Sequence, residues 1–342
     1  MGLFIKPQRL KVGDTVATIS LSGGRAGDSY NLERYALGKH RLEQIFGLKV
    51  VEMPNSMKGF EYLYEHPKAR ADDLMEALIN PNIKGIFLNM GGDEGIRLLP
   101  YVDFDAIRNN PKIFIGFSDG DTFHHMFRYA GVTSFYGAGI LTTIAEPCSL
   151  NPYTIKWIKK ALFSAEPIGQ IEPPERWLPL QNGYESINKT EDELTWINGE
   201  GYKVYQGSGK VRGHIMTACS GPLGLMLGTR LFPKPDLWKD SIICFEGGAG
   251  YGIMLAGVHA MRAFAASGMF SQAKALVLQK ISDEEVKEII LKVLREEGLT
   301  NLPVFTGVAF GHLNPMTVLP IGVEAEIDCD NKTFTILESG VI

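Results

Sequence analysis

The first half of the chain alternates short apolar segments with amphipathic ones, and this alternation constrains the fold more than any other feature. Strands are predicted at residues 15–21 (TVATISL), 48–53, 84–90 (KGIFLNM) and 112–117 (KIFIGF), and helices at 31–45 and 69–79. Strands that are apolar on both faces and separated by helices are typical of a mostly parallel sheet covered on both sides. The βαβα order therefore predicts an α/β layered domain.

The amino-acid composition changes near the middle of the chain. Residues 167–209 are dominated by Pro, Gly, Asn and Glu with interspersed aromatic residues, which predicts a linker or a long functional loop rather than core. Further strands (241–245, 275–278, 304–309, 323–328 and 333–338) and helices (253–266 and 284–297) predict a second, mixed domain. We therefore expect an N-terminal α/β domain at 1–170, a linker or active-site loop at 171–209, and a C-terminal domain at 210–342.

Composition excludes several classes of function. The 342 residues are 45% hydrophobic and 21% charged with a net charge of −5, and no basic stripe marks a surface for a nucleic-acid polymer. The four cysteines lie far apart without a CxxC pair, which favours a reduced, cytosolic compartment, and three of them are expected to be buried. The N-terminus lacks the apolar run of a signal peptide, and no stretch is long enough to span a membrane. We expect a cytoplasmic enzyme with no membrane contact.

The segment Gly116-Phe117-Ser118-Asp119-Gly120 lies between a predicted strand and a predicted helix. It matches G-x-S-x-G in the strand–turn–helix setting of a nucleophile elbow, where small neighbours allow a strained turn that exposes the serine hydroxyl. A serine that only caps the following helix is the alternative. Ser118 is thus a candidate nucleophile.

A second glycine-rich turn, Gly91-Gly92-Asp93-Glu94-Gly95, follows the strand at 84–90. Glycines let the backbone approach a ligand closely, so their N–H groups can serve an anion or oxyanion. A phosphate loop is the rival interpretation, but neither GK[ST] nor GxGxxG is present, so no nucleotide cofactor is expected. An ordinary strand-to-helix turn is the other alternative.

Two late strand ends carry an acid and a histidine. Glu246 closes the strand at 241–245, and His312 follows the strand at 304–309 within Gly311-His312-Leu313-Asn314-Pro315. Together with Ser118 they supply the residue types of a hydrolase triad: the serine attacks, the histidine takes its proton, and the carboxylate orients the imidazole. A single His or Glu at a strand end is more often a hydrogen-bonded surface residue.

The other histidines are weaker candidates for the base. His124 and His125 lie on the helix after Ser118, where at least one is expected to face solvent, and His214 and His259 are expected to be core residues. No H-x-x-x-H or HExxH spacing supports a metal site.

Across nearly its whole length, the sequence resembles the LD-carboxypeptidase family of serine peptidases and its microcin C immunity (MccF-like) branch. The matching segments are RADDLMEALINPNIKGIFLNMGGDEGIRLLPYVDFDAI, NPKIFIGFSDGDTF, VTSFYG, IICFEGG and PVFTGVAFGHLNPMTVLPIGVEAEID. The resemblance implies an N-terminal Rossmann-like domain, similar to class I glutamine amidotransferases, followed by a smaller mixed α/β domain. It also implies a homodimer and a triad assembled across the two domains.

Residue by residue, the resemblance implies Ser118 as nucleophile, Glu246 as acid and His312 as general base. It implies an oxyanion hole from the amides of Asp119 and of a glycine in the GG pair, with Gly92 preferred. Gly91, Asp93 and Glu94 fall at the substrate rim, where the family commonly has GGYG, and acidic residues there are closer to the MccF-like branch.

Two further departures concern substrate contacts. Gly213-His214-Ile215-Met216 occupies the stretch of a GGNL-type segment, and GGAGYG follows the acid strand in place of a more acidic continuation.

Two substrates compete within the family. MccF-like enzymes cleave aminoacyl- or peptidyl-nucleotides of the microcin C type, whereas murein tetrapeptide LD-carboxypeptidases remove a terminal D-amino acid from cell-wall peptides. Trp177 and Trp196 in the long loop favour the first, because an exposed Trp can stack on a nucleobase, although they could instead pin the loop to the core. A small-molecule binding protein without activity, and an α/β-hydrolase esterase, are the alternatives from other classes.

Overall fold

The computed structural model describes residues 4–179, 188–247, 253–280 and 284–342. A six-stranded sheet has the order β15-β5-β4-β3-β1-β2, and all its pairings are parallel except β15 with β5. Its strands are β1 (Thr15–Ile19), β2 (Lys49–Glu52), β3 (Ile83–Leu88), β4 (Ile113–Gly116), β5 (Phe135–Tyr136) and β15 (Leu319–Pro320). The predicted parallel α/β sheet is confirmed, and the ends of the four predicted strands differ from the observed ones by at most two residues.

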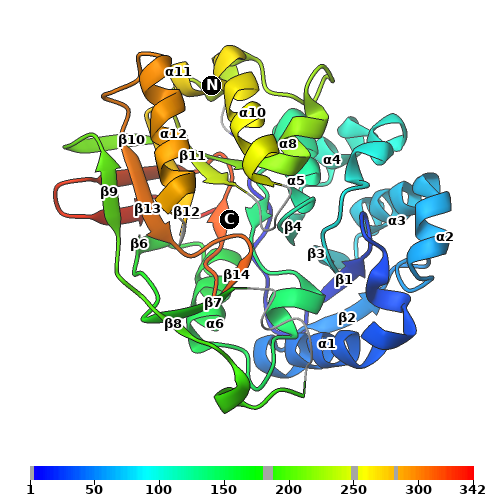
Figure 1. The fold of residues 1–342 in the computed structure, drawn as a ribbon. Helices are drawn as coiled ribbons and strands as arrows, with labels where there is room; N and C mark the ends of the chain where they lie inside the picture. Colours follow the sequence, from blue (N-terminus) through cyan, green and yellow to red (C-terminus); the bar gives the residue numbers. More distant parts are fainter. Residues whose placement is uncertain (1–3, 180–187, 248–252, 281–283) are drawn as a thin grey trace.

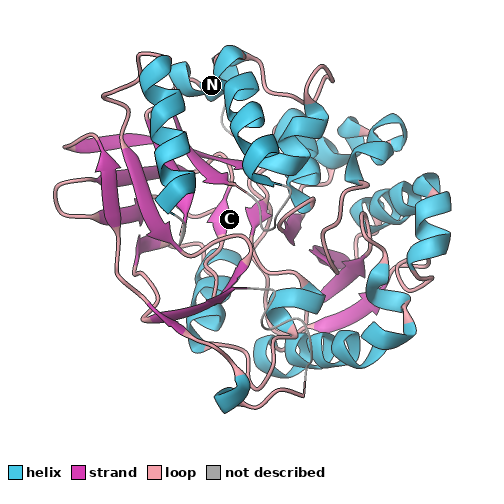
Figure 2. Ribbon diagram, in the orientation of Figure 1, coloured by secondary structure: helices cyan, strands magenta, loops and turns pink. Residues whose placement is uncertain are grey.

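Helices cover both faces of this sheet (Figures 1 and 2). On one face α3 contacts β1 and β3 and α5 contacts β4, while α1 packs beside β2 with the turn η4 on the other face. These elements are α1 (Leu32–Phe46), α2 (Phe60–Glu65), α3 (Pro67–Ile79), α4 (Phe104–Asn109), α5 (Gly120–Ala130) and η4 (Ile140–Ile144). Helix α3 begins at Pro67, where the missing N–H of proline removes no helical hydrogen bond.

The second sheet has eight strands in the order β6-β17-β16-β10-β11-β12-β13-β9. Its centre, β10 to β13, is parallel, and antiparallel strands flank it on both sides. The strands are β6 (Gly169–Ile171), β9 (Lys203–Gln206), β10 (Lys210–Cys219), β11 (Ser241–Glu246), β12 (Ala275–Gln279), β13 (Val304–Val308), β16 (Glu324–Asp328) and β17 (Thr333–Ile336). This arrangement confirms the predicted mixed second α/β unit.

The helices of the second half lie mainly on one face of the second sheet, and α10 and α12 run side by side over its parallel strands (Figure 1). The helices of the second half are α8 (Ser220–Met226), α9 (Pro235–Trp238), α10 (Ile253–Ala266), α11 (Met269–Gln272) and α12 (Glu284–Glu296), and α6 (Pro152–Ile158) precedes them in the first half. Short turns of helix complete the list: η1 (Arg25–Gly27), η2 (Ser29–Asn31), η3 (Gly95–Tyr101), η5 (Lys159–Phe163) and η6 (Glu191–Glu193).

Each hydrophobic core runs through both sheets. Ile242 and Cys244 of β11 face the core that contains Val16 of β1, whereas Ile243 and Phe245 face the other core. This alternation is the period of two that a strand imposes on its side chains. The two sheets therefore share both cores and pack as continuous layers.

The segment 167–209, predicted to be a linker or loop, is more structured than expected. It contributes both edge strands of the second sheet, β6 and β9. It also contributes β7 (Arg176–Pro179) and β8 (Ile197–Asn198), which form a small antiparallel sheet with β14 (Leu313–Asn314). These short strands owe their conformation to pairing with distant partners, which local sequence does not reveal. Residues 180–187, including Tyr184, and 248–252 of the GGAGYG segment lie outside the described residues.

Of the four cysteines, Cys219, Cys244 and Cys329 are buried and Cys148 is exposed, and all four are free. The prediction of three buried thiols is confirmed. Within the described ranges, no helix is both long and apolar enough to cross a membrane.

Candidate active site

Ser118 lies on the turn between β4 and α5 with φ +62°, a left-handed conformation that is rare for a residue with a side chain. The turn is closed by hydrogen bonds from Gly120 N–H to Phe117 O and from Asp121 N–H to Ser118 O, both 2.9 Å. A Cβ at Gly116 would approach Leu88 Cβ to 2.8 Å, so the glycine leaves the space that the Leu88 side chain of the neighbouring strand β3 fills. This is the strand–turn–helix geometry of a nucleophile elbow, with Ser118 half-buried at its tip.

The GG turn lies directly against the serine. A Cβ at Gly91 would lie 2.9 Å from Ser118 Oγ and 3.2 Å from the Asp119 nitrogen, so the Gly91 backbone, the hydroxyl and the Asp119 amide share one small space. Gly92 is adjacent, with φ +151° and its Cα against Ser22 and Gly23 of the loop after β1. The Asp119 amide, so close to the hydroxyl, suits an oxyanion hole, whereas Gly92 lies against the loop after β1.

The Asp119 carboxylate is buried and is bonded to neighbouring protein groups. It accepts hydrogen bonds from Gly95 N–H (2.7 Å), Thr122 Oγ1 (3.0 Å) and Ser22 Oγ. Burial raises the pKa of this carboxyl group, although the three donors oppose the shift. The Asp119 side chain thus ties the loops after β1 and β3 to the elbow. Its backbone N–H lies on the side of Ser118 Oγ and is the candidate donor to an oxyanion.

Asp93 and Glu94 lie at the rim beside the GG turn. Asp93 is exposed, whereas Glu94 is half-buried and forms an ion pair with Arg97 at 2.5 Å. The Glu94 amide also donates to Ser22 Oγ at 3.3 Å.

Glu246 and His312 are in direct contact. Glu246 ends β11 and is only 1% exposed, and its Oε1 accepts hydrogen bonds from the His312 backbone N–H (2.9 Å) and from His312 Nδ1. Because a carboxylate only accepts, Nδ1 carries the proton and Nε2 is the free base of the neutral ring. A Cβ at Gly311 (φ +80°) would overlap the Glu246 carboxylate, so the glycine before His312 is a steric requirement.

Glu246 and His312 each shift the pKa of the other toward its charged form. Burial opposes the imidazolium, but the Glu246 charge and hydrogen bond outweigh it, so the pKa of His312 is raised above its usual value. Burial likewise opposes the carboxylate, but His312 and the other donors lower the pKa of Glu246. The pair therefore favours an ionised acid beside a base that titrates above its ordinary range.

Two contacts join the pair to the elbow. The His312 ring packs edge-on against Phe117, with ring centroids 5.2 Å apart. The hydroxyl of Tyr136, at the end of β5, accepts a hydrogen bond from Ser118 N–H at 3.2 Å and donates to Glu246 Oε2. All three predicted triad residues thus belong to one connected cluster through Tyr136, which lies in the matching segment VTSFYG but was assigned no role from the sequence.

The predictions for the other histidines need correction. His124 and His125 are both buried, because every residue of helix α5 except Tyr129 is buried, so neither histidine faces solvent. His124 is hydrogen-bonded to Ser134 Oγ and Gly116 O, each at 2.9 Å. His259, expected in the core, is exposed, and His214 is half-buried.

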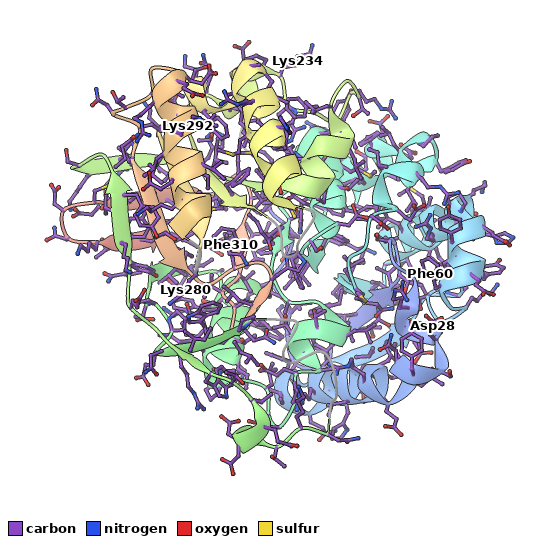
Figure 3. The ribbon with its side chains drawn as sticks, viewed as in Figure 1. Asp28, Phe60, Lys234, Lys280, Lys292 and Phe310 are labelled. Carbon is purple, nitrogen blue, oxygen red and sulfur yellow. The ribbon has the colours of Figure 1, made fainter. Side chains whose placement is uncertain are left out.

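The loop tryptophans also differ from expectation. Trp177 is only 5% exposed and packs on Ala309 and Leu313 beside the His312 loop. The ammonium group of Lys280, which is labelled in Figure 3, lies 4.9 Å from the centroid of its ring. Trp177 is therefore no exposed platform. Trp196 is half-buried, with the Arg176 guanidinium 4.4 Å from its ring centroid. In the described part of the chain, no three His, Cys, Asp or Glu side chains are grouped to hold a metal ion.

Two named relatives match nearly the whole chain. Microcin C7 self-immunity protein MccF of Escherichia coli is 29% identical over 96% of this chain and 94% of its own. A Bacillus subtilis protein named as a probable murein peptide carboxypeptidase is 24% identical over 98% and 95%.

Solved structures show the same fold. MccF in complex with aspartyl sulfamoyl adenosine superposes with a TM-score of 0.85 at 26% identity, covering 99% of this chain and all of that one. An MccF-like protein from Streptococcus pneumoniae in complex with AMP gives 0.80 at 25% identity, covering 95% and 98%. Residues 16–137 match the LD-carboxypeptidase N-terminal domain and residues 212–327 match the C-terminal domain, so the chain belongs to the LD-carboxypeptidase family of peptidases.

Proposed function

We propose that the chain is a serine hydrolase that cleaves an amide bond through an acyl-enzyme, using Ser118, His312 and Glu246. The observation that carries this proposal is the connected cluster: a serine in a strained elbow, and a buried Glu246 that holds Nδ1 of His312. Ser118 Oγ attacks the carbonyl carbon as its proton passes to His312 Nε2, and Glu246 stabilises the imidazolium. The amides of Asp119 and Gly92 stabilise the oxyanion. His312 then protonates the leaving amine, and water releases the acyl group by the reverse sequence.

The leading substrate is an aminoacyl- or peptidyl-nucleotide. The likeness to MccF in complex with aspartyl sulfamoyl adenosine supports this class, as does 29% identity to MccF against 24% to the murein peptide carboxypeptidase. The acidic rim at Asp93 and Glu94 is compatible with an ammonium group on the substrate. A murein tetrapeptide is the second candidate, supported by the name of that relative.

Parallel assays test the substrate class. Purified enzyme is incubated with an aminoacyl sulfamoyl adenosine and with a murein tetrapeptide, and mass spectrometry follows the products, with Ser118→Ala as the control. We expect release of the free amino acid and sulfamoyl adenosine only with the native serine. Release of a terminal D-amino acid from the tetrapeptide alone would favour the second candidate, and binding without turnover or active-site labelling would favour a binding protein.

The tryptophans can be separated by the same assay. Trp196, with one ring face against Arg176, is the remaining candidate for a nucleobase contact, and its replacement by alanine should raise KM only for the adenosine substrate, by about 10–100-fold. Trp177→Ala should instead reduce turnover of every substrate, because Trp177 packs beneath the His312 loop. Equal losses on substrates with and without the base in both variants would make the loop purely structural.

We also propose that the protein works in the cytoplasm as a homodimer, with a domain boundary near residue 170. The four free cysteines are compatible with a reducing compartment. Light scattering after size-exclusion chromatography measures the assembly, and a monomeric mass at micromolar concentration would contradict it.

A further inference from the structure

Tyr136 is fixed on both sides at the junction of the two halves of the chain. Its strand, β5, pairs with β4 through Gly116↔Tyr136, and with β15 of the C-terminal half through Leu319↔Tyr136. The side chain is 1% exposed and its ring packs near His124 and Phe310, at centroid distances of 5.5 and 6.3 Å. A ring held this way leaves its hydroxyl little freedom to choose partners.

That hydroxyl bonds to two groups of the candidate active site. It accepts from Ser118 N–H, so its own single proton is available for Glu246 Oε2. Burial raises the pKa of Tyr136 well above that of a free phenol, so the hydroxyl remains a donor at every working pH. With His312 N and Nδ1 on Oε1 and Tyr136 on Oε2, both oxygens of the buried carboxylate have partners.

We propose that Tyr136 is a positioning residue of the hydrolase: through one hydroxyl it fixes the strained Ser118 turn and the Glu246 carboxylate relative to each other. This inference rests on the proposed triad and goes beyond it. Because Tyr136 is 1% exposed and its hydroxyl is bonded to Ser118 and Glu246, it acts on the chemical step through these two residues.

The effect on the histidine follows from the carboxylate. Without the Tyr136 hydroxyl, the Glu246 carboxylate has one hydrogen-bond donor fewer to stabilise its negative charge. A protonated His312 stabilises that charge better than a neutral His312 does, so the pKa of His312 rises. The Glu246–His312 pair then holds its proton to a higher pH.

Tyr136→Phe tests the inference, because phenylalanine keeps the ring and removes only the hydroxyl. Tyr202→Phe is the matched control: Tyr202 is also a buried tyrosine, but its hydroxyl donates to Ile171 O at 2.8 Å, among residues that the triad does not use. Both variants are compared with the native enzyme by the rate of labelling with a fluorophosphonate, in which Ser118 Oγ bonds to phosphorus, fluoride leaves and His312 takes the serine proton.

We expect Tyr136→Phe to lower the labelling rate by about 10–100-fold, the size typical of a lost hydrogen bond to a charged group. The pH at half-maximal rate should move upward, and for any substrate found kcat should fall while KM stays unchanged. Tyr202→Phe should keep the native rate and the native pH profile. A native rate and profile in Tyr136→Phe would overturn the inference, as would equal losses in both variants with no shift in pH.

A second measurement covers a Tyr136→Phe protein that does not fold. Replacing Tyr136 with 3,5-difluorotyrosine keeps the hydroxyl and makes it a stronger donor, so the pH at half-maximal labelling should move downward; an unchanged profile would overturn the inference. Failure of the proposed function gives a different result. In that case the native enzyme is not labelled, or Ser118→Ala is labelled equally well.

Discussion

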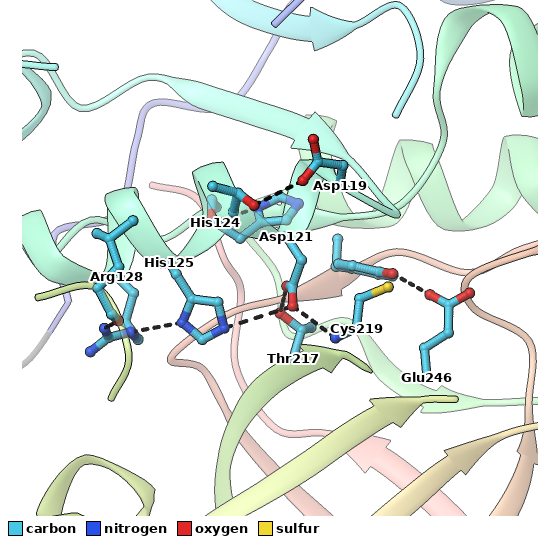
Figure 4. Close-up of polar contacts among 12 residues, drawn as sticks. Asp119, Asp121, His124, His125, Arg128, Thr217, Cys219 and Glu246 are labelled. Carbon is cyan, nitrogen blue, oxygen red and sulfur yellow. Dashed lines mark hydrogen bonds and ion pairs between the residues drawn. The ribbon is translucent and has the colours of Figure 1, made fainter. Parts of the chain in front are cut away.

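Two buried carboxylates lie at the interface between the halves of this molecule, and they differ in what surrounds them. Glu246 accepts from His312 and Tyr136, whereas Asp121 on α5 accepts from Thr217 Oγ1 (2.6 Å) and Cys219 N–H (2.8 Å) of β10 (Figure 4). The two acids are near neighbours, since Cys219 pairs with Glu246 across β10 and β11. Both are at most 1% exposed.

The pKa values of the two carboxyl groups nevertheless shift in opposite directions. The pKa of Glu246 is lowered because His312 can take a proton beside it, which outweighs the effect of burial. The pKa of Asp121 is raised to about 7 by burial, and its neighbour His125, 3.7 Å away, cannot compensate because burial and Arg128 lower the pKa of that imidazole. A buried carboxylate keeps its charge where a cation can form next to it, so only the Glu246 region is suited to acid–base chemistry, while the Asp121 region joins α5 to β10.

Removal of the nucleophile should give the largest effect and set the scale for this comparison. Ser118→Ala should lower kcat by about 10⁴–10⁶-fold with the fold intact, His312→Ala should cost a similar amount, and the double variant little more, because the groups act as a unit. Steady-state kinetics and circular dichroism on all three proteins check this. Losses that add in the double variant would show that the two residues do not share a triad.

Neutralising each acid tests the difference directly. Glu246→Gln should lower kcat by about 10²–10⁴-fold, less than loss of the nucleophile, because the acid orients and stabilises but does not react. Asp121→Asn, the matched change at the other carboxylate, should leave kcat of the folded protein within about fivefold of native, since Asp121 bonds only to neutral donors at a strand end. Near-native activity in Glu246→Gln, or a loss of comparable size in Asp121→Asn, would remove the distinction.

The sequence predicted individual strands and helices better than the way in which the strands pair. Runs that are apolar on both faces reveal buried parallel strands, so 112–117 predicted β4 (Ile113–Gly116), and helix α10 was predicted with its observed bounds. Strand β10 was missed because KVRGHIMTAC has charge and glycine at one end and no clear alternation. Its role depends on pairing with β11 and β16, which no local pattern encodes.

The candidate site was also predictable only in part. Ser118, Glu246 and His312 could be chosen because each residue type stands at a strand end bordered by glycine. Tyr136 could not, because its bond to Glu246 spans 110 residues of sequence. The burial of Trp177 was hidden for the same reason: it depends on the pairing of β7 with β14.

The pH dependence of activity tests the charge of the Glu246 region. His312 must be neutral to accept the serine proton, and because Glu246 raises its pKa, kcat/KM should rise with pH to an inflection above the ordinary histidine value of about 6.5 and then level off. Below the inflection the rate should change about tenfold per pH unit. Profiles from pH 5 to 9, with chemistry rate-limiting, check this, and a flat profile or an inflection below 6 would contradict the assignment of His312 as base.

The pH dependence of stability tests the Asp121 region, where we expect the smallest effect. The folded state holds the Asp121 proton up to a pKa of about 7, whereas the unfolded chain releases it near 3.9, so between these values the folded state binds more protons. The contribution of Asp121 to the stability of the fold is therefore complete below about pH 4 and is lost as the pH rises through 7.

Glu246 should affect stability in the opposite direction, since its lowered pKa contributes stability above about pH 4.5 that is lost on acidification. Asp121→Asn cannot titrate, so from pH 4.5 to 7.5 the native protein should lose roughly 2–4 kcal/mol relative to this variant. Urea unfolding of both proteins across this range gives the two curves, and if they run parallel, Asp121 is ionised in the fold and the contrast with Glu246 fails.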